Sequence, residues 1–273
     1  MTEATLPTAA IDSRVLAPRI TRATAWVSTR AARVAARLPR WSRSTAVVRT
    51  LAVLAALAGL NITAHLAGLD AKIVIPVGAA ALAGLAWASG LRSRSLGVHH
   101  EHARHGLKVA LGCIAVTAAV LTIALLIPQT AQFFQDSRYA DGREVALAVF
   151  ILIPLTTVIP EELAFRGVLD GALQQHLGER GSYLVGAIAF GAWHVLTTGA
   201  LTSGNAGLTT LLGSGLLSQV LGVLTVVAAT SVAGLGFIWL RRRTGSVLAP
   251  MGMHWALNGL AAIATRVATH PPF

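Results

Sequence analysis

Long apolar runs alternate with short polar segments along the chain, and this pattern predicts an all-α, polytopic bundle of membrane-spanning helices. Each run has about 15 to 25 residues, enough as a helix to cross most or all of a hydrocarbon core roughly 30 Å thick. The periodic stripes typical of core helices in soluble proteins are shorter than these runs. The seven runs are 47–69, 73–91, 107–127, 145–159 continued by 163–173, 183–197, 216–240 and 247–267.

Two segments affect the expected number of spans. Segment 204–215 is rich in Gly, Ser and Thr, and it suits a re-entrant or interfacial piece as well as a loop. It raises the expected count from seven to eight. The stretch 144–177 would be about 50 Å long as one straight helix, well beyond a bilayer core. We therefore expect Pro154 and Pro160 to kink or break it.

Composition and the placement of charge agree with a membrane protein. Only 12% of the residues are charged and 54% are hydrophobic, whereas ordinary soluble domains carry about 25% charged residues. A net charge of +11 raises the question of nucleic acid, but the arginines cluster before the first run and in alternate loops, as in proteins with positive cytoplasmic segments. We therefore expect no nucleic-acid partner, contact with the lipid bilayer and a cytoplasmic amino terminus. The preference for Arg over Lys and for Ala favours a bacterial plasma membrane.

The same pattern indicates one transmembrane domain between two tails. Residues 1–44 are rich in Arg, and we expect a cytoplasmic tail, although this composition also suits a transit peptide or an interfacial helix. Residues 45–268 form the helical domain, and 269–273 a short tail. Cys113 is the single cysteine, which excludes an intrachain disulfide and any thiolate-rich metal site.

An adjacent pair of glutamates between two apolar runs indicates chemistry. Glu161 and Glu162 directly follow Pro160, and an ionisable group at membrane depth normally faces a partner, a bundle interior or a water-filled cavity. Glu162, Arg166 and Asp170 share one helical face at spacings of four, so Arg166 can pair with either carboxylate. Glu161 points about 100° away, which makes it the candidate base and Glu162 its brace. The alternative is a purely structural ladder of ion pairs.

Two histidines lie in later apolar runs at helical spacing from a second residue. His194 follows Phe190 by four positions, and Asn258 follows His254 by four, so each pair shares a face. A single buried histidine is more often structural than catalytic. Counted from the cytoplasmic ends of the runs, however, both histidines and Glu161 fall at similar depths of about 12 to 24 Å. We therefore expect one polar layer within the bilayer.

The sequence at these places reads PEELAFRGVL, FGAWH and MHWALN. It resembles the CAAX protease and bacteriocin-processing family (CPBP, also called Abi), whose motifs are EExxxR, FxxxH, and HxxxN or HxxxD. The resemblance covers residues 144–267, and the three motifs occur in the family's order. The matching residues are Glu161, Glu162, Arg166, Phe190, His194, His254 and Asn258.

The resemblance implies an intramembrane endopeptidase. It assigns activation of a water to Glu161 and His194 and the binding of the oxyanion to His254 and Asn258, with structural support from Glu162, Arg166 and Phe190. Family members are often called metalloproteases, and Glu161, His194 and His254 could bind zinc, but a metal-free mechanism is equally compatible with the spacing. The implied substrate is a membrane-associated peptide or protein, either prenylated and of CAAX type or bacteriocin-like.

Other polar positions favour more ordinary roles. His99, His100, His102 and His105 lie in a loop without an HExxH motif, which favours a solvated, pH-responsive segment over adventitious metal binding. Gly167 and Gly171 form a GxxxG face that would let another helix approach closely. Asn61 and His65 share a face of the first span, where hydrogen bonds across helices are expected.

Two other functions suit the same spans. One is a non-catalytic scaffold or a bacteriocin self-immunity protein, which would not require the complete set of Glu161, His194, His254 and Asn258. The other is a transporter or proton relay, since buried carboxylates and histidines also serve conduction. Transport would favour inverted repeats or paired broken helices, and the sequence contains neither pattern.

Overall fold

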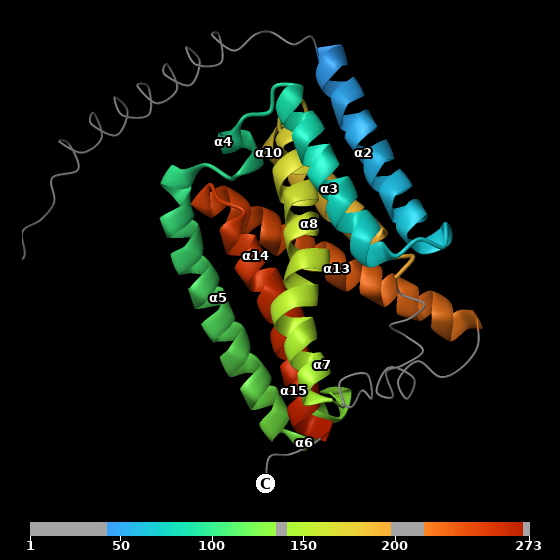
Figure 1. Ribbon diagram of the computed structural model, residues 1–273, viewed down its shortest axis with the longest axis vertical. Helices are drawn as coiled ribbons and strands as arrows, with labels where there is room; N and C mark the ends of the chain where they lie inside the picture. Colours follow the sequence, from blue (N-terminus) through green and yellow to red (C-terminus); the bar gives the residue numbers. More distant parts are fainter. Residues whose placement is uncertain (1–42, 135–140, 198–215, 270–273) are drawn as a thin grey trace, which may run out of the picture. The chain divides into compact units, whose positions relative to one another are not determined.

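The computed structural model describes residues 43–134, 141–197 and 216–269, and every regular element within them is helical (Figure 1). The predicted re-entrant segment 204–215 and nearly all of the amino-terminal tail lie outside the described residues. The elements are α2 (Arg43–Leu66), α3 (Ala71–Ala88), α4 (Ser93–Leu96), α5 (His100–Leu126), α6 (Pro128–Ala131), η1 (Gln132–Phe134), α7 (Gly142–Leu147), η3 (Ala148–Val158), α8 (Ile159–Glu162), η4 (Leu163–Leu169), α9 (Asp170–Leu173), α10 (Gly178–Trp193), α13 (Leu216–Thr244), α14 (Leu248–Trp255), η5 (Ala256–Leu260) and α15 (Ala261–Thr269).

Within the described residues, five helical stretches are long and apolar enough to cross a membrane, which identifies an integral membrane protein. Two further predicted spans, 183–197 and 247–267, are helical but are not among the five, so a total of seven or eight stays a prediction. Helix α10, which covers most of 183–197, has only 16 residues. In 247–267, the polar residues His254 and Asn258 interrupt the apolar sequence. The five stretches are Thr45–Leu66, Ala71–Ala88, Ser93–Leu126, Gly142–Leu173 and Leu217–Thr244.

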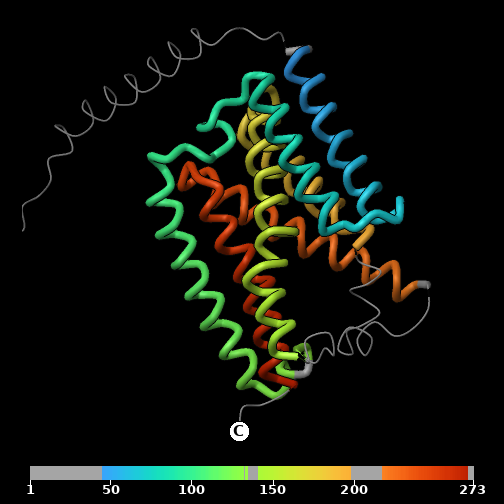
Figure 2. Tube along the Cα trace, in the orientation of Figure 1, coloured from blue at the N-terminus to red at the C-terminus, as the bar shows by residue number. Residues whose placement is uncertain are grey.

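Of the kink or break expected at the prolines, the break is wrong, because the helix that carries the glutamate pair is continuous. Elements α7, η3, α8, η4 and α9 follow one another without a gap from Gly142 to Leu173, as Figure 2 shows. Pro154 lies in η3, whose turns are of the wider π type, and there the backbone N–H of Ile159 donates to the carbonyl of Pro154. Pro160 stands at the first turn of α8. Each proline lacks a backbone N–H donor, and the wider π turns allow the helix to continue without it.

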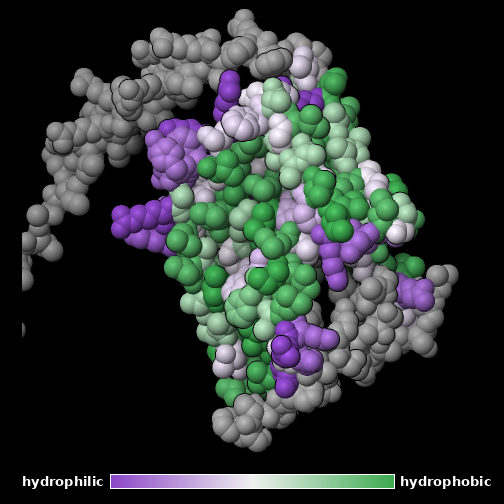
Figure 3. Space-filling model, viewed as in Figure 1, coloured by the Kyte–Doolittle hydropathy of each residue, from purple (hydrophilic) through white to green (hydrophobic). Residues whose placement is uncertain are grey.

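The apolar core lies where this long helix meets α3, α10 and α13. Fully buried aliphatic and aromatic side chains of η4, including Phe165 and Leu169, pack with Phe190 of α10 and Phe237 of α13. Other large apolar side chains are exposed along the helices, and they form the broad green areas of the space-filling view, with hydrophilic patches between them (Figure 3). An exposed apolar surface of this kind is suited to lipid contact.

The GxxxG face of the long helix packs closely against another segment, as predicted. A Cβ atom added to Gly167 would lie 3.2 Å from the carbonyl oxygen of Leu96, and one added to Gly171 would lie 2.9 Å from Cδ2 of Leu91. The partner is therefore the short helix α4, together with Leu91 of the connection that leads into it. Two small residues allow this connection to lie directly on η4 and α9.

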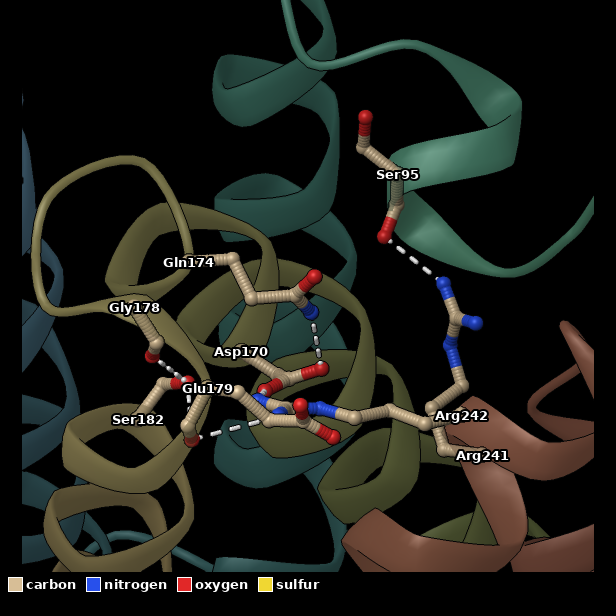
Figure 4. A network of polar contacts seen from close by, with 8 residues as sticks. All are labelled: Ser95, Asp170, Gln174, Gly178, Glu179, Ser182, Arg241 and Arg242. Carbon is tan, nitrogen blue, oxygen red and sulfur yellow. Dashed lines mark hydrogen bonds and ion pairs between the residues drawn. The ribbon is translucent and has the colours of Figure 1, made fainter. Parts of the chain in front are cut away.

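Asp170 takes part in a different network from the one expected. Its Oδ1 accepts from Arg242 of α13 at 2.5 Å and its Oδ2 accepts from Gln174 at 2.6 Å (Figure 4). Arg242 also donates to Ser182 of α10 at 2.7 Å. The predicted ladder therefore ends at Arg166, because the oxygens of Asp170 are engaged by side chains that tie α9 to α10 and α13.

The neighbouring Arg241 anchors α4. Its guanidinium donates to the carbonyls of Arg94 at 3.0 Å and Ser95 at 2.8 Å, and the second of these bonds appears in Figure 4. Gly97, which ends α4 with φ +73°, lies directly against the same guanidinium. A side chain at this position would meet both a left-handed backbone and the arginine. Arg241 and Arg242 together connect α13 to α4, α9 and α10.

Candidate active site

Glu161 and Glu162 lie in α8, and both side chains are buried although they point in different directions. Glu162 is 0% exposed and Glu161 is 6% exposed. Because consecutive residues of a helix differ by about 100°, the two carboxylates meet different neighbours. Burying two carboxylates together is unfavourable unless positive charge and hydrogen-bond donors compensate. The contacts of each carboxylate show how the fold provides them.

Glu162 connects the long helix to α14. Its Oε1 accepts from Nδ1 of His254 at 2.8 Å and lies 3.1 Å from Nη1 of Arg166 in the expected i, i+4 ion pair. A carboxylate paired with arginine is ionised and can only accept, so Nδ1 of His254 must carry the proton. Glu162 therefore makes the expected ion pair with Arg166, and it also orients His254 through Nδ1.

Arg166 is buried in an aromatic environment. Its guanidinium carbon lies 3.9 Å from the ring centroid of Phe190 and 4.6 Å from that of Phe237. Stacking on aromatic rings stabilises a cation that burial has removed from water. The ring of Phe190 also meets His194 at 4.8 Å and His254 at 5.9 Å between centroids. Phe190 thus contacts the cation and both imidazoles.

Glu161 has one anchored oxygen and one oxygen without a partner. Its Oε1 accepts from the indole Nε1 of Trp193 at 3.1 Å. Its Oε2 is buried without a hydrogen bond to any described residue, and lies 4.0 Å from Nε2 of His254. Two atoms at this separation can share one water at normal hydrogen-bond distances of about 2.8 Å. The separation of these two atoms would allow one water molecule to bridge Glu161 and His254.

His194 stands at the end of α10. It is the C-cap residue of the helix, and its Nδ1 lies 2.8 Å from the carbonyl oxygen of Phe190. A carbonyl can only accept, so Nδ1 carries the proton and the neutral ring has its lone pair on Nε2. This tautomer suits a residue that accepts a hydrogen bond from a water.

Asn258 lies in η5, one turn after His254 and in a segment of wider π turns. Its side chain is half-buried and makes no hydrogen bond to another described residue. Wide turns often occur at functional positions of helices. That His254 and Asn258 share a helical face, and that Asn258 binds the oxyanion, both stay predictions.

Two residues at this site were not singled out from the sequence. Trp193 anchors Glu161, and Phe237 stacks on His254 with 5.0 Å between ring centroids. A usable signal existed for Trp193, because a tryptophan within an apolar run needs an acceptor for its N–H and here directly precedes a motif histidine. Phe237 had no such signal, since one phenylalanine in an apolar helix is indistinguishable from any other core residue.

The predicted zinc ligands do not gather into a metal site. Among the described residues, no group of three His, Cys, Asp or Glu side chains is arranged to hold a metal ion. Of the three candidates, Glu161 and His254 approach each other at 4.0 Å. The histidine-rich segment gathers no metal site either; His99 stacks on His100, and its Nδ1 lies 3.7 Å from Glu101.

Comparison with known proteins agrees with this arrangement. Residues 143–260 match the family model described as type II CAAX prenyl endopeptidase Rce1-like. The matched segment contains all seven motif residues and ends before the last part of the expected core, 261–267. No curated protein and no solved structure matched the chain. The order of the motifs, the buried glutamate and histidine site and this match together show that residues 143–260 form a domain of the Rce1-like CAAX endopeptidase (CPBP) family, a family of peptidases that act on protein substrates.

Proposed function

We propose that the protein is an intramembrane endopeptidase in which Glu161 is the general base for a hydrolytic water. One observation carries this proposal: the buried Glu161 carboxylate is held at one oxygen by Trp193, and its other oxygen faces Nε2 of His254 across 4.0 Å. A base held in a dry site beside a second proton-accepting group has the arrangement that water activation requires.

The proposed reaction begins when Glu161 takes a proton from the water and the resulting hydroxide attacks the scissile carbonyl carbon. The carbonyl oxygen becomes an oxyanion, which needs preorganised donors. The proton held by Glu161 then passes to the leaving amine as the carbon–nitrogen bond breaks. His194, with its lone pair on Nε2, would orient the water.

The hydrogen bond of His254 to Glu162 limits what its imidazole can do in this scheme. The resemblance assigns it, with Asn258, to the oxyanion, but its Nδ1 proton is already donated to Glu162. His254 can therefore donate to an oxyanion only through Nε2, and only when that nitrogen is protonated. The amide of Asn258 needs no such change, because its N–H groups are donors in every protonation state.

The proposed substrate is a peptide or protein associated with the membrane, of prenylated CAAX type or bacteriocin-like. Support comes from the five long apolar helices and from the burial of both glutamates within one of them. A peptide bond in or near the bilayer could reach such a site, whereas a folded soluble protein could not. We further propose a bacterial plasma membrane and a cytoplasmic amino terminus, because positive charge concentrates on that side of the spans.

The test is cleavage of a peptide library by the purified protein in detergent, with prenylated and unmodified CAAX peptides included. We expect Glu161→Gln and His194→Ala to lower the rate by about 10²- to 10⁴-fold, the usual contribution of acid–base groups. Glu144→Gln is the matched control, because Glu144 is an exposed carboxylate on the same continuous helix. Cleavage that survives in both variants would overturn the mechanism. Ion flux in proteoliposomes without any cleavage would favour a transporter.

A further inference from the structure

A recess lies beside the proposed catalytic residues and has no role in the scheme above. It is a pocket of about 340 Å³ between α2, η4 and α10, within the roughly 300 to 1,000 Å³ typical of ligand pockets. Its walls are largely apolar. They include Leu57 and Ala58 of α2, Phe165 of η4, and Ala192 and Trp193 of α10.

One polar side chain in the wall has an unused acceptor. Asn61 of α2 is 7% exposed, and its Nδ2 donates to the backbone carbonyl of Trp193 at 2.9 Å. Its Oδ1 is buried and has no hydrogen-bond partner among the described residues. Buried acceptors are nearly always satisfied, so an unpartnered one in a pocket wall indicates a missing donor. The pocket therefore suits an apolar ligand that carries an N–H or O–H group.

Trp193 links this pocket to the chemistry. Its ring lines the pocket, and its Nε1 donates to Oε1 of Glu161 at 3.1 Å. Its backbone carbonyl receives the hydrogen bond from Asn61. An occupant of the pocket would lie against the side chain that holds the general base, so the pocket is placed to bind a part of the substrate close to the bond that is cut.

We propose that this pocket is a substrate subsite for an unwound, apolar peptide segment next to the scissile bond. One apolar side chain fills the pocket, and one backbone N–H of the segment donates to Oδ1 of Asn61. Hydrolysis requires an extended backbone, and an unwound peptide within a membrane needs acceptors for its N–H groups. A lipid hydrocarbon chain has no donor and would leave Asn61 unsatisfied, which favours a peptide as the occupant. This inference rests on the proposed function.

The subsite is formed by residues from two parts of the chain. Asn61 and the α2 wall lie outside the segment 143–260 that matches the peptidase family, whereas Phe165 and Trp193 lie within it. The matched domain would supply the chemistry, and α2 would select which peptide segment is accepted.

Binding is tested by photocrosslinking in the Glu161→Gln background, so that the probe is not consumed. The probe is a biotinylated peptide of Leu and Ala with one benzoylphenylalanine, and the crosslinked residues are mapped by mass spectrometry. We expect crosslinks within residues 54–62 and a loss of at least about tenfold in Ala58→Trp, which fills the pocket. Ala56→Trp is the control, because Ala56 is exposed on α2 and does not line the pocket. Crosslinks elsewhere, or a yield that Ala58→Trp leaves unchanged, would overturn the subsite.

The hydrogen bond is tested by replacing each backbone amide of the probe with an ester, one at a time. At one position the ester should weaken binding of the probe to the parent protein by about tenfold. The same ester should have little effect on binding to Asn61→Leu, because that variant already lacks the acceptor. If every ester weakened binding to the parent protein and to Asn61→Leu equally, Asn61 would not be the acceptor of the peptide N–H.

The subsite and the proposed function can fail separately. Pocket crosslinking without hydrolysis by the unmutated protein would keep the subsite as a peptide-binding site and remove the peptidase. Hydrolysis without pocket crosslinking would keep the peptidase and remove the subsite.

Discussion

His254 donates from Nδ1 to the carboxylate of Glu162 at 2.8 Å and thereby joins α14 to α8. The same bond turns Nε2 of the imidazole toward Glu161, 4.0 Å away. A residue that looks like a brace for its own helix therefore also positions a side chain from a distant part of the chain. The glutamate pair divides into one residue that organises the site and one that is available for reaction.

Removal of the Glu162 carboxylate should damage stability and activity together. In Glu162→Ala the buried guanidinium of Arg166 loses its ion pair at 3.1 Å, and stranding a buried charge costs about 3 to 5 kcal/mol. We expect a lower unfolding midpoint in detergent, with Glu144→Ala as the exposed control. The double variant Glu162→Leu with Arg166→Met should recover much of the stability but no activity. A single variant as stable as the parent protein would contradict the assigned ion pair.

Trp193→Phe should lower activity with a modest effect on stability. The variant keeps an aromatic ring but loses the N–H that donates to Glu161, and a hydrogen bond of this kind contributes about 0.5 to 1.5 kcal/mol. We expect kcat to fall about tenfold, because even a small misplacement of the general base is costly.

The control for this variant is Trp255→Phe. It removes a comparable N–H, which donates to the carbonyl of Val149 at 2.9 Å and not to a glutamate. Activity should then stay near that of the parent while stability falls by a similar amount. Equal losses of kcat in both variants would show that Trp193 has no particular link to the site.

Gly191→Ala should separate α10 from α13. A Cβ atom at this position would lie 2.7 Å from the carbonyl oxygen of Val227 and would overlap Oγ of Ser231. Overpacking against backbone costs about 1 to 3 kcal/mol, and the shift would move Phe190 and Trp193 on either side. Gly112→Ala is the control, because nothing lies within 4 Å of its added Cβ. Thermal unfolding in detergent should show a clear decrease for the first variant and none for the second.

Cleavage should survive removal of divalent metals. The described side chains provide no group of three metal-binding residues, and the proposed water is held by Glu161 and an imidazole. We expect full activity after dialysis against EDTA and phenanthroline, whereas a zinc endopeptidase treated in parallel should lose its activity. Activity that disappears with the chelators and returns with zinc, together with one zinc per chain by mass spectrometry, would overturn the metal-free scheme.

Several features of the site could be predicted because they depend on local geometry. The i, i+4 spacing of Glu162 and Arg166 predicts their ion pair, and the structure contains it. The third member of the expected ladder, Asp170, pairs with Arg242 of α13. Spacing within one helix shows which side chains can meet, but it does not reveal a competing arginine from another helix.

The kink or break expected at Pro154 and Pro160 shows a second limit of local rules, because the structure contains no break there. Each proline removes a donor from the helix, which favours interruption. Wide turns in η3 and η4 nevertheless carry the helix from Gly142 to Leu173. From Pro160 to Leu173 the helix is buried almost throughout, and this packing supports a backbone that the prolines alone would disfavour.

The amino-acid sequence by itself determined the all-α membrane class, the residues able to do the chemistry and their order, because hydropathy and helical spacing are properties of short segments. Tertiary structure decided which nitrogen of His254 is protonated, that Trp193 anchors Glu161 and that α2 completes a pocket beside them. These relationships join residues up to 132 positions apart. Only the packing of separate helices brings such side chains within hydrogen-bond distance, and no local pattern records it.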